Sequence, residues 1–119
     1  MDRKKELGNF GEQAAALSYE KDGYSVVQTN YRQRFGEIDV IAQGHGCIVF
    51  CEVKLRSEKS MVSPAQAVDI YKQRKIIMTA QAWLCAHNTP LQPRFDVVQI
   101  IHRSGEILSL ERIENAFGV

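Results

Sequence analysis

The segment GEIDVIAQGHGCIVFCEVKLR, residues 36–56, is the part of this chain that most constrains its fold. Two apolar stretches flank a Gly-His-Gly turn, a pattern typical of a β-hairpin. Charged residues nevertheless interrupt both stretches, with Asp39 in the first and Glu52 and Lys54 near the end of the second. Because a buried charge is costly unless something compensates it, these three residues are candidates for a functional site.

The length of the turn decides whether the two acidic side chains meet. If His45 and Gly46 form a two-residue loop, Gly44 pairs with Cys47 and Asp39 lies directly opposite Glu52. Directly opposed side chains share a face of the sheet, with Cβ atoms about 5 Å apart. A three-residue loop would shift the pairing by one residue and separate the two faces.

Two opposed carboxylates repel each other, so a shared proton or a cation should compensate them. Two carboxylates that leave positions open for water and phosphate suit Mg²⁺ or Mn²⁺. Lys54 shares a strand face with Glu52, where its ammonium group could orient a water molecule or stabilise charge on a phosphate. These groups suffice for metal-assisted hydrolysis of a phosphodiester. An ion-pair cluster at a sheet edge would explain the same short pattern without any chemistry.

The remaining pattern predicts helices and strands around this hairpin. We expect a helix over 3–21, strands over 24–31, 36–43 and 47–54, a long helix opened by Ser63-Pro64 that ends near His87, and strands over 93–101 and 107–113. The order α-β-β-β-α-β-β predicts an α/β fold, a mixed central β-sheet flanked by helices, in a single domain over residues 1–119. Core positions expected on the helices are Leu7, Phe10, Ala14, Leu17, Tyr71, Ile76, Ile77 and Trp83.

Glu12 lies on the first predicted helix, outside its large apolar stripe. Its neighbours on the same side are small, namely Gly8, Gly11, Ala15 and Ala16. Small neighbours would let the helix approach another backbone closely and carry Glu12 toward the acidic site. A surface glutamate favoured by the helix dipole explains its position equally well.

The chain has 15 Lys and Arg residues and 14 Asp and Glu residues, so its net charge is +1. This net charge does not by itself indicate a nucleic-acid-binding protein. The distribution is more informative. Local basic groups occur at Arg32 and Arg34, at Lys54 and Arg56, and at Lys72, Arg74 and Lys75. Solvated surface explains any one of these groups, and only their convergence on one face would make a binding surface.

The cysteines and the hydropathy pattern favour a cytoplasmic location. The chain has three cysteines and no C-x-x-C motif, so we expect a reducing environment, with Cys47 and Cys51 as small core residues. No run of eighteen apolar residues predicts a membrane span, and no apolar stretch follows the charged N-terminus as a secretion signal would require.

Asp39 followed by Glu52-Val53-Lys54 resembles the D…(D/E)xK signature of restriction-endonuclease-like nucleases. Most of the chain resembles the YraN-like family of bacterial proteins, which is grouped with archaeal-type Holliday junction resolvases. The matching motifs are Gly8-x-x-Gly11-Glu12 with Ala15, Asn30-Tyr31-Arg32, Gly36-Glu37-Ile38-Asp39, Val49-Phe50-Cys51-Glu52-Val53-Lys54-x-Arg56, Ala67-Val68 with Lys72 and Lys75, and Arg94-Phe95-Asp96-Val97-Val98. Met61-Val62-Ser63-Pro64 departs from the family, where a glycine is expected before the helix.

The resemblance implies a role for each site residue. Asp39 and Glu52 would bind Mg²⁺ or Mn²⁺ with the Val53 carbonyl, Lys54 would position the attacking water, and Glu12 would contact the metal through water. Candidates for phosphate contact are Arg32, Arg34, Arg56, Lys72, Arg74 and Lys75.

The resemblance also implies a metal-dependent DNA endonuclease that acts on branched or single-stranded DNA, and a two-fold homodimer would fit cleavage of symmetric junctions. A non-catalytic nucleic-acid-binding or adaptor protein that retains the fold is the alternative, and a protein-interaction subunit without a DNA role is a third. We expect Arg94 and Asp96 to form a structural ion pair rather than part of the site.

Overall fold

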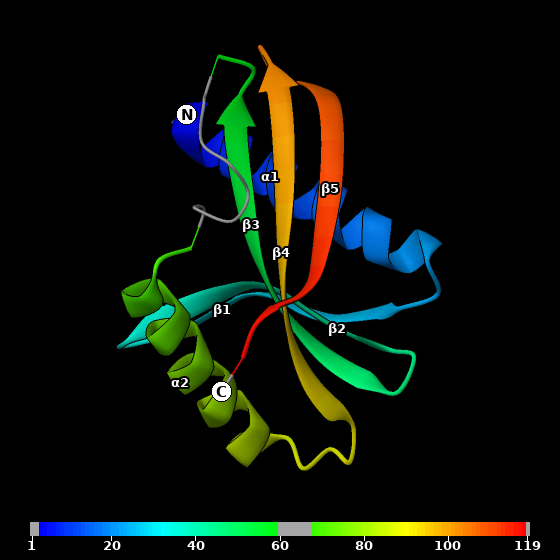
Figure 1. Ribbon diagram of the computed structural model, residues 1–119, viewed down its shortest axis with the longest axis vertical. Coiled ribbons are helices and arrows are strands. Elements are labelled where there is room, and N and C mark those ends of the chain that lie inside the picture. The colour runs from blue at the N-terminus through cyan, green and yellow to red at the C-terminus, as the bar shows by residue number, and fades with distance from the viewer. Residues whose placement is uncertain (1–2, 60–67, 119) are drawn as a thin grey trace.

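The computed structural model describes residues 3–59 and 68–118 of the chain (Figure 1). The elements in chain order are α1 (Arg3–Lys21), β1 (Ser25–Gln33), β2 (Gly36–Gly44), β3 (Cys47–Ser57), α2 (Ile70–Ala86), β4 (Gln92–Arg103) and β5 (Glu106–Phe117). This order confirms the α-β-β-β-α-β-β prediction, and most strands extend a few residues beyond the predicted ends.

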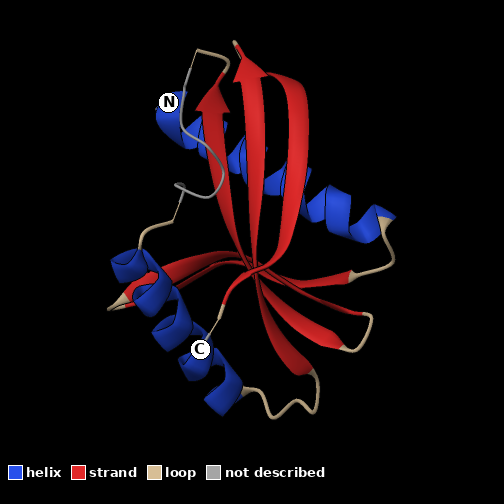
Figure 2. Ribbon diagram, viewed as in Figure 1, coloured by secondary structure: helices blue, strands red, loops and turns tan. Residues whose placement is uncertain are grey.

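The five strands form one strongly twisted sheet in the order β1-β2-β3-β4-β5 (Figure 2). Strands β3 and β4 run parallel, whereas the other neighbouring pairs are antiparallel, so the predicted mixed sheet is confirmed. The candidate hairpin β2–β3 therefore includes the central strand. A cluster of charges on β3 lies inside the sheet and not at its edge.

The two helices cover opposite faces of this sheet. Alternate residues of β3 divide between two cores: Ile48 and Phe50 pack toward α2, whereas Val49 and Cys51 pack toward α1. Successive side chains of a strand point to opposite faces, which explains why nearly continuous apolar residues suit this buried strand. The apolar residues of β2 and β3 thus hold a helix on each side.

The sheet-facing side of α1 differs from the predicted one. Ala15 and Tyr19 are fully buried there, whereas Leu17 is 51% exposed, so its assignment to the core was wrong. A Cβ atom added to Gly11 would lie 3.5 Å from Cγ1 of Val53. At Gly11, α1 therefore approaches β3 too closely for a large side chain, which is the close approach expected for the helix that carries Glu12.

Helix α2 begins later than predicted. The proposed start at Ser63-Pro64 lies outside the described residues, and α2 begins at Ile70 with Asp69 as its N-cap. The Asp69 side chain accepts a hydrogen bond from the backbone N–H of Lys72 at 2.8 Å, which satisfies a donor that a helix start leaves free. The helix ends at Ala86, close to the predicted end.

Two of the residues that were predicted to be in the core on α2 are buried. Trp83 and Ile76 are buried as predicted, but Tyr71 is 72% exposed and its assignment to the core was wrong. Neither α1 nor α2, the helices within the described ranges, combines the length and apolar character that crossing a membrane requires.

The predicted ion pair of Arg94 and Asp96 is confirmed and anchors a buried network on β4. Arg94 Nη2 lies 2.9 Å from Oδ2 of Asp96, which is fully buried. The Tyr19 hydroxyl donates to the same oxygen at 2.7 Å, and the Asn115 N–H donates to the other carboxylate oxygen at 3.0 Å. The network joins α1, β4 and β5, which is consistent with the structural role assigned to this pair.

Candidate active site

The pairing of β2 with β3 follows the register expected from a two-residue turn. Gly44 pairs with Cys47, and the ladder continues to the pair Val40–Cys51. His45 and Gly46 form the turn with positive φ angles of 51° and 79°, as the tightest hairpin turns require. One more step along this register brings Asp39 level with Glu52.

The two strands separate at this step, and the separation opens a pocket. The described ladder ends at Val40–Cys51, after which Oδ2 of Asp39 accepts the backbone N–H of Val53 at 2.7 Å. A side chain thus replaces the backbone partner that β3 loses. The resulting pocket, about 230 Å³ in volume, is lined by Glu12, Glu37, Asp39, Glu52, Val53 and Leu55. Four carboxylates from α1, β2 and β3 therefore face one small space.

The pocket disfavours the ionised form of Asp39. Burial, followed by the negative charge of Glu52, raises the pKa of Asp39 to about 7, although the hydrogen bond from Val53 opposes the shift. Near neutral pH the Asp39 carboxylate therefore gains strongly from a positive charge placed beside it.

Glu52 already has two positive partners. Its side chain is 5% exposed, and its Oε1 lies 3.4 Å from Nζ of Lys54 and 3.1 Å from Nζ of Lys72. Burial alone would lower the pKa of Lys72, but the charge of Glu52 and the hydrogen bond to it raise that pKa above its usual value. Lysine ammonium groups thus occupy one side of the acid in this structure.

Glu12 reaches the same pocket from α1. The pKa of Glu12 is raised above its usual value, chiefly because the side chain is partly buried. The nearby Asn30 side chain opposes this shift, and the negative charge of Glu37 adds to it. Asn30 has a positive φ of 54° within β1, a backbone conformation that Asn tolerates better than most residues. Because Thr29 pairs with Val40 and Tyr31 with Ile38, Asn30 lies across from Asp39. Asn30 and Glu12 therefore both lie beside Asp39.

The donor set of the pocket suits a hard divalent cation. Mg²⁺ typically keeps several waters and uses only one or two protein carboxylates, and Asp39 and Glu52 supply two. The Val53 carbonyl points to the same side as its N–H, which is directed at Asp39, because both groups of one residue face the same strand neighbour. Within residues 3–59 and 68–118, no group of three or more His, Cys, Asp or Glu side chains could hold a metal ion. A bound ion would therefore need water or phosphate oxygens to complete its coordination.

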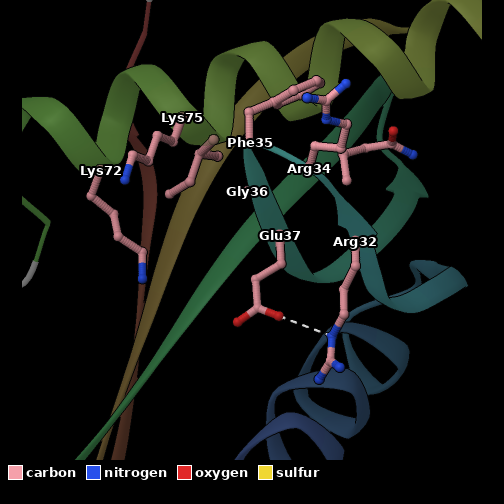
Figure 3. Close-up of a pocket in the computed structure, with 9 residues that line it drawn as sticks. Arg32, Arg34, Phe35, Gly36, Glu37, Lys72 and Lys75 are labelled. Atoms are coloured by element: carbon pink, nitrogen blue, oxygen red, sulfur yellow. Dashed lines mark ion pairs between the residues drawn. The ribbon is translucent and has the colours of Figure 1, made fainter.

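A basic pocket adjoins the acidic one. Its volume is about 410 Å³, and its lining includes Arg32, Arg34, Phe35, Gly36, Glu37, Lys72, Lys75 and Ile76. Glu37 lines both pockets and forms an ion pair with Arg32 at 3.1 Å. Figure 3 shows that the positive side chains come from two elements, the end of the β1–β2 hairpin and α2. Two of the three local basic groups in the sequence thus converge.

Arg56 and Arg74 do not belong to that lining. Arg56 lies on β3 beyond Lys54, and Arg74 is exposed on α2 between the two lysines that line the pocket. The structure therefore brings together four of the six residues considered for phosphate contact: Arg32, Arg34, Lys72 and Lys75.

Close packing at Gly36 fixes the hairpin end against α2. A Cβ atom added to Gly36 would lie 2.8 Å from Oγ1 of Thr79 and 3.3 Å from the backbone oxygen of Lys75. Real Cβ atoms are essentially never found this close to another atom, so a side chain would not fit at Gly36. Glycine thus allows the two halves of the basic pocket to pack directly on each other.

Three features of the site escaped sequence reasoning. Lys72 was considered for phosphate contact, but the structure pairs it with Glu52, and no local pattern relates these residues. Asn30 was quoted only as part of a motif, although an Asn within a strand rich in Val and Thr is itself a signal of an irregular backbone. Phe35, between Arg34 and Gly36, was not considered at all, although it is 36% exposed.

Comparison with known proteins shows which protein family this chain is similar to. The model of a family described as "Uncharacterised protein family UPF0102" matches residues 11–100. A UPF0102 protein of Caldanaerobacter subterraneus is 40% identical over 118 residues, which cover 96% of each chain. UPF0102 proteins of Clostridium botulinum and Myxococcus xanthus are 38% and 36% identical; the matches cover 97% and 96% of this chain, and 96% and 90% of the relatives.

Proposed function

This chain belongs to the UPF0102 family, which is the YraN-like family that its motifs resemble, and we propose that it is a metal-dependent DNA endonuclease. The observation that carries the proposal is the pocket shared by Asp39 and Glu52, where burial and the charge of Glu52 disfavour the ionised form of Asp39. A protein gains no stability from holding two buried acids together. A divalent cation bound between the two carboxylates would compensate their repulsion, so the pair would bind such an ion favourably.

Asp39, Glu52 and the Val53 carbonyl would hold Mg²⁺ or Mn²⁺. When bound, the ion would supply Lewis acidity toward a phosphate oxygen and lower the pKa of a water molecule. Lys54, paired with Glu52, would orient the attacking water or stabilise negative charge on the phosphate. Glu12, which lines the same pocket, would accept a hydrogen bond from a water there.

The substrate would lie across both pockets. Phosphate groups on either side of the scissile bond would contact Arg32, Arg34, Lys72 and Lys75, which converge beside the acids. Hydrolysis would add water across one P–O bond and leave a phosphate on one fragment and a hydroxyl on the other. A homodimer would supply two such sites for the two strands of a symmetric junction, which sedimentation analysis in solution tests.

The test is cleavage of labelled single-stranded, duplex and four-way-junction DNA with Mn²⁺ or Mg²⁺. We expect wild-type protein to cut at least one of these forms, and Glu52→Gln to cut at least 100-fold more slowly while it keeps the wild-type melting temperature within a few degrees. Glu106→Gln, an exposed acid at the start of β5, is the matched control and should cut normally. Equal cleavage by the wild type and Glu52→Gln would refute the proposal.

A specific observation favours the alternative of a non-catalytic nucleic-acid-binding protein. Lys54 and Lys72 already neutralise Glu52, so this acid is satisfied without a metal ion. This alternative predicts salt-sensitive binding of DNA that is identical in EDTA and in Mn²⁺, with no cleavage under either condition. Mobility-shift titrations in the two buffers distinguish it from the endonuclease.

A further inference from the structure

The geometry points to Phe35 as a stacking platform for an unpaired base, so that the substrate of this site is single-stranded DNA or the unpaired segment of a branched DNA. This inference rests on the proposed function and specifies the form of its substrate. Phe35 lies at the end of the β1–β2 hairpin and is 36% exposed, although the sheet and helices offer two apolar cores. About a third of this large aromatic residue thus stays accessible beside positive charge, where a ligand could contact it.

The surroundings of Phe35 match the chemistry of a nucleotide. Arg32, Arg34 and Lys75 line the same pocket as Phe35, so it offers positive groups for a nucleic-acid backbone and an aromatic face for a base. Figure 3 shows Arg34 beside Phe35, and Arg32 farther away, next to Glu37. Sites for single-stranded nucleic acid combine these two elements, a positive groove and exposed aromatic rings on which bases stack. In a regular duplex the bases are stacked inside, where this ring has no access to their faces. The pocket therefore favours DNA with at least one unstacked base.

The position of Phe35 along the chain connects the platform to the acids. Asp39 lies four positions after Phe35, a distance that extended chain spans in about 13 Å. Glu37 lies between them and lines both pockets, and Lys72 lines the basic pocket while it contacts Glu52. A short run of nucleotides would reach from a stacked base to the acidic pocket, so the platform sets which phosphate faces the acids.

The packing of Gly36 makes the platform rigid. Because a Cβ atom at Gly36 would lie 2.8 Å from Oγ1 of Thr79 and 3.3 Å from the backbone oxygen of Lys75, the hairpin end packs closely on α2 next to Phe35. A rigid platform loses less freedom on binding than a mobile loop would, which favours affinity.

The experiment measures binding in EDTA, where no metal-dependent cleavage takes place, so its outcome is separate from that of the nuclease assay. Fluorescein-labelled single-stranded and duplex oligonucleotides of equal length are titrated with wild type, Phe35→Ala and Tyr71→Ala. Tyr71 is the matched control, because it is an exposed aromatic residue on α2 outside the pocket lining. We expect Phe35→Ala to weaken binding of the single strand about tenfold. We also expect little change for the duplex and none for Tyr71→Ala.

A second variant tests stacking directly. Phe35→Trp keeps the platform, and its emission should be quenched by the single-stranded oligonucleotide, whereas the emission of Tyr71→Trp should not change. The buried Trp83 gives both variants the same background. Equal loss of single-strand and duplex affinity in Phe35→Ala, or unquenched emission of Phe35→Trp at saturating single strand, would overturn the inference. If stacking is observed but no DNA is cut in Mn²⁺, the inference stands and the endonuclease proposal fails.

Discussion

Replacing Asp39 by Asn should stabilise the metal-free protein at pH 8. Asn has nearly the same shape as Asp and its carbonyl oxygen still accepts the Val53 N–H, but it removes a carboxylate that burial and Glu52 disfavour. A pKa raised from 3.8 to about 7 corresponds to about 4 kcal/mol at full ionisation. Asp39 keeps some exposure and nearby lysines adjust, so we expect about 1 to 3 kcal/mol, or about 4 to 12 °C in melting temperature.

The sign of the effect fixes its pH dependence. A carboxyl group whose pKa is higher in the folded state stabilises the fold below its unfolded pKa of 3.8, and this contribution is lost as pH rises through about 7. The advantage of Asp39→Asn should therefore be largest at pH 8 and shrink to about a third at pH 5. Thermal unfolding followed by circular dichroism in EDTA measures this difference.

Adding Mn²⁺ should reverse the order of stability. A ligand that binds only the folded state raises the melting temperature, so wild type should gain stability with Mn²⁺ while Asp39→Asn gains much less. Glu106→Gln is the control and should follow wild type under all conditions. If Asp39→Asn is less stable than wild type at pH 8 in EDTA, or if the gap does not narrow at pH 5, the ionised Asp39 does not destabilise the fold.

Three further substitutions test separate parts of the structure. Lys72→Met removes the ammonium 3.1 Å from Glu52, so calorimetry should show Mn²⁺ binding about 2- to 10-fold tighter, while oligonucleotide binding weakens; weaker Mn²⁺ binding would contradict the pairing. Gly36→Ala places a Cβ atom 2.8 Å from Oγ1 of Thr79 and should lower the unfolding free energy in urea by about 1 to 3 kcal/mol, which an added Thr79→Ala should partly restore. Asp96→Asn leaves the largely buried Arg94 with Glu114, 3.7 Å away, as its remaining countercharge and should cost about 3 kcal/mol in the same assay; no measurable loss would contradict a structural role for the pair.

The hairpin and its acids were predictable because they depend on local rules. The turn residues His45 and Gly46 tolerate positive φ, and strict alternation then fixes every partner along β2 and β3. Arg94 and Asp96 are likewise two residues apart on one strand, so their proximity follows from strand geometry. Such features need no knowledge of the remaining chain.

The contribution of α2 was not predictable in the same way. Lys72 meets Glu52 only because long-range packing of Trp83 and Ile76 sets the position of the helix on the sheet. Leu17 was assigned to the core because it recurs at helical spacing with other apolar residues, whereas the side of α1 that faces the sheet is the one that carries Gly11 and Ala15. Periodicity identifies a helix, but it does not state how near the helix lies to its neighbour.

The division of the site between one tight hairpin and a distant helix affects how the protein folds. Asp39 and Glu52 are only thirteen positions apart in the sequence, so hairpin closure brings them together through short-range contacts. Lys72 arrives with the later docking of α2, which requires contacts between remote segments. The nascent hairpin therefore brings two like charges together with only Lys54 as a countercharge before Lys72 arrives, and dissolved cations would ease that early stage by screening the repulsion.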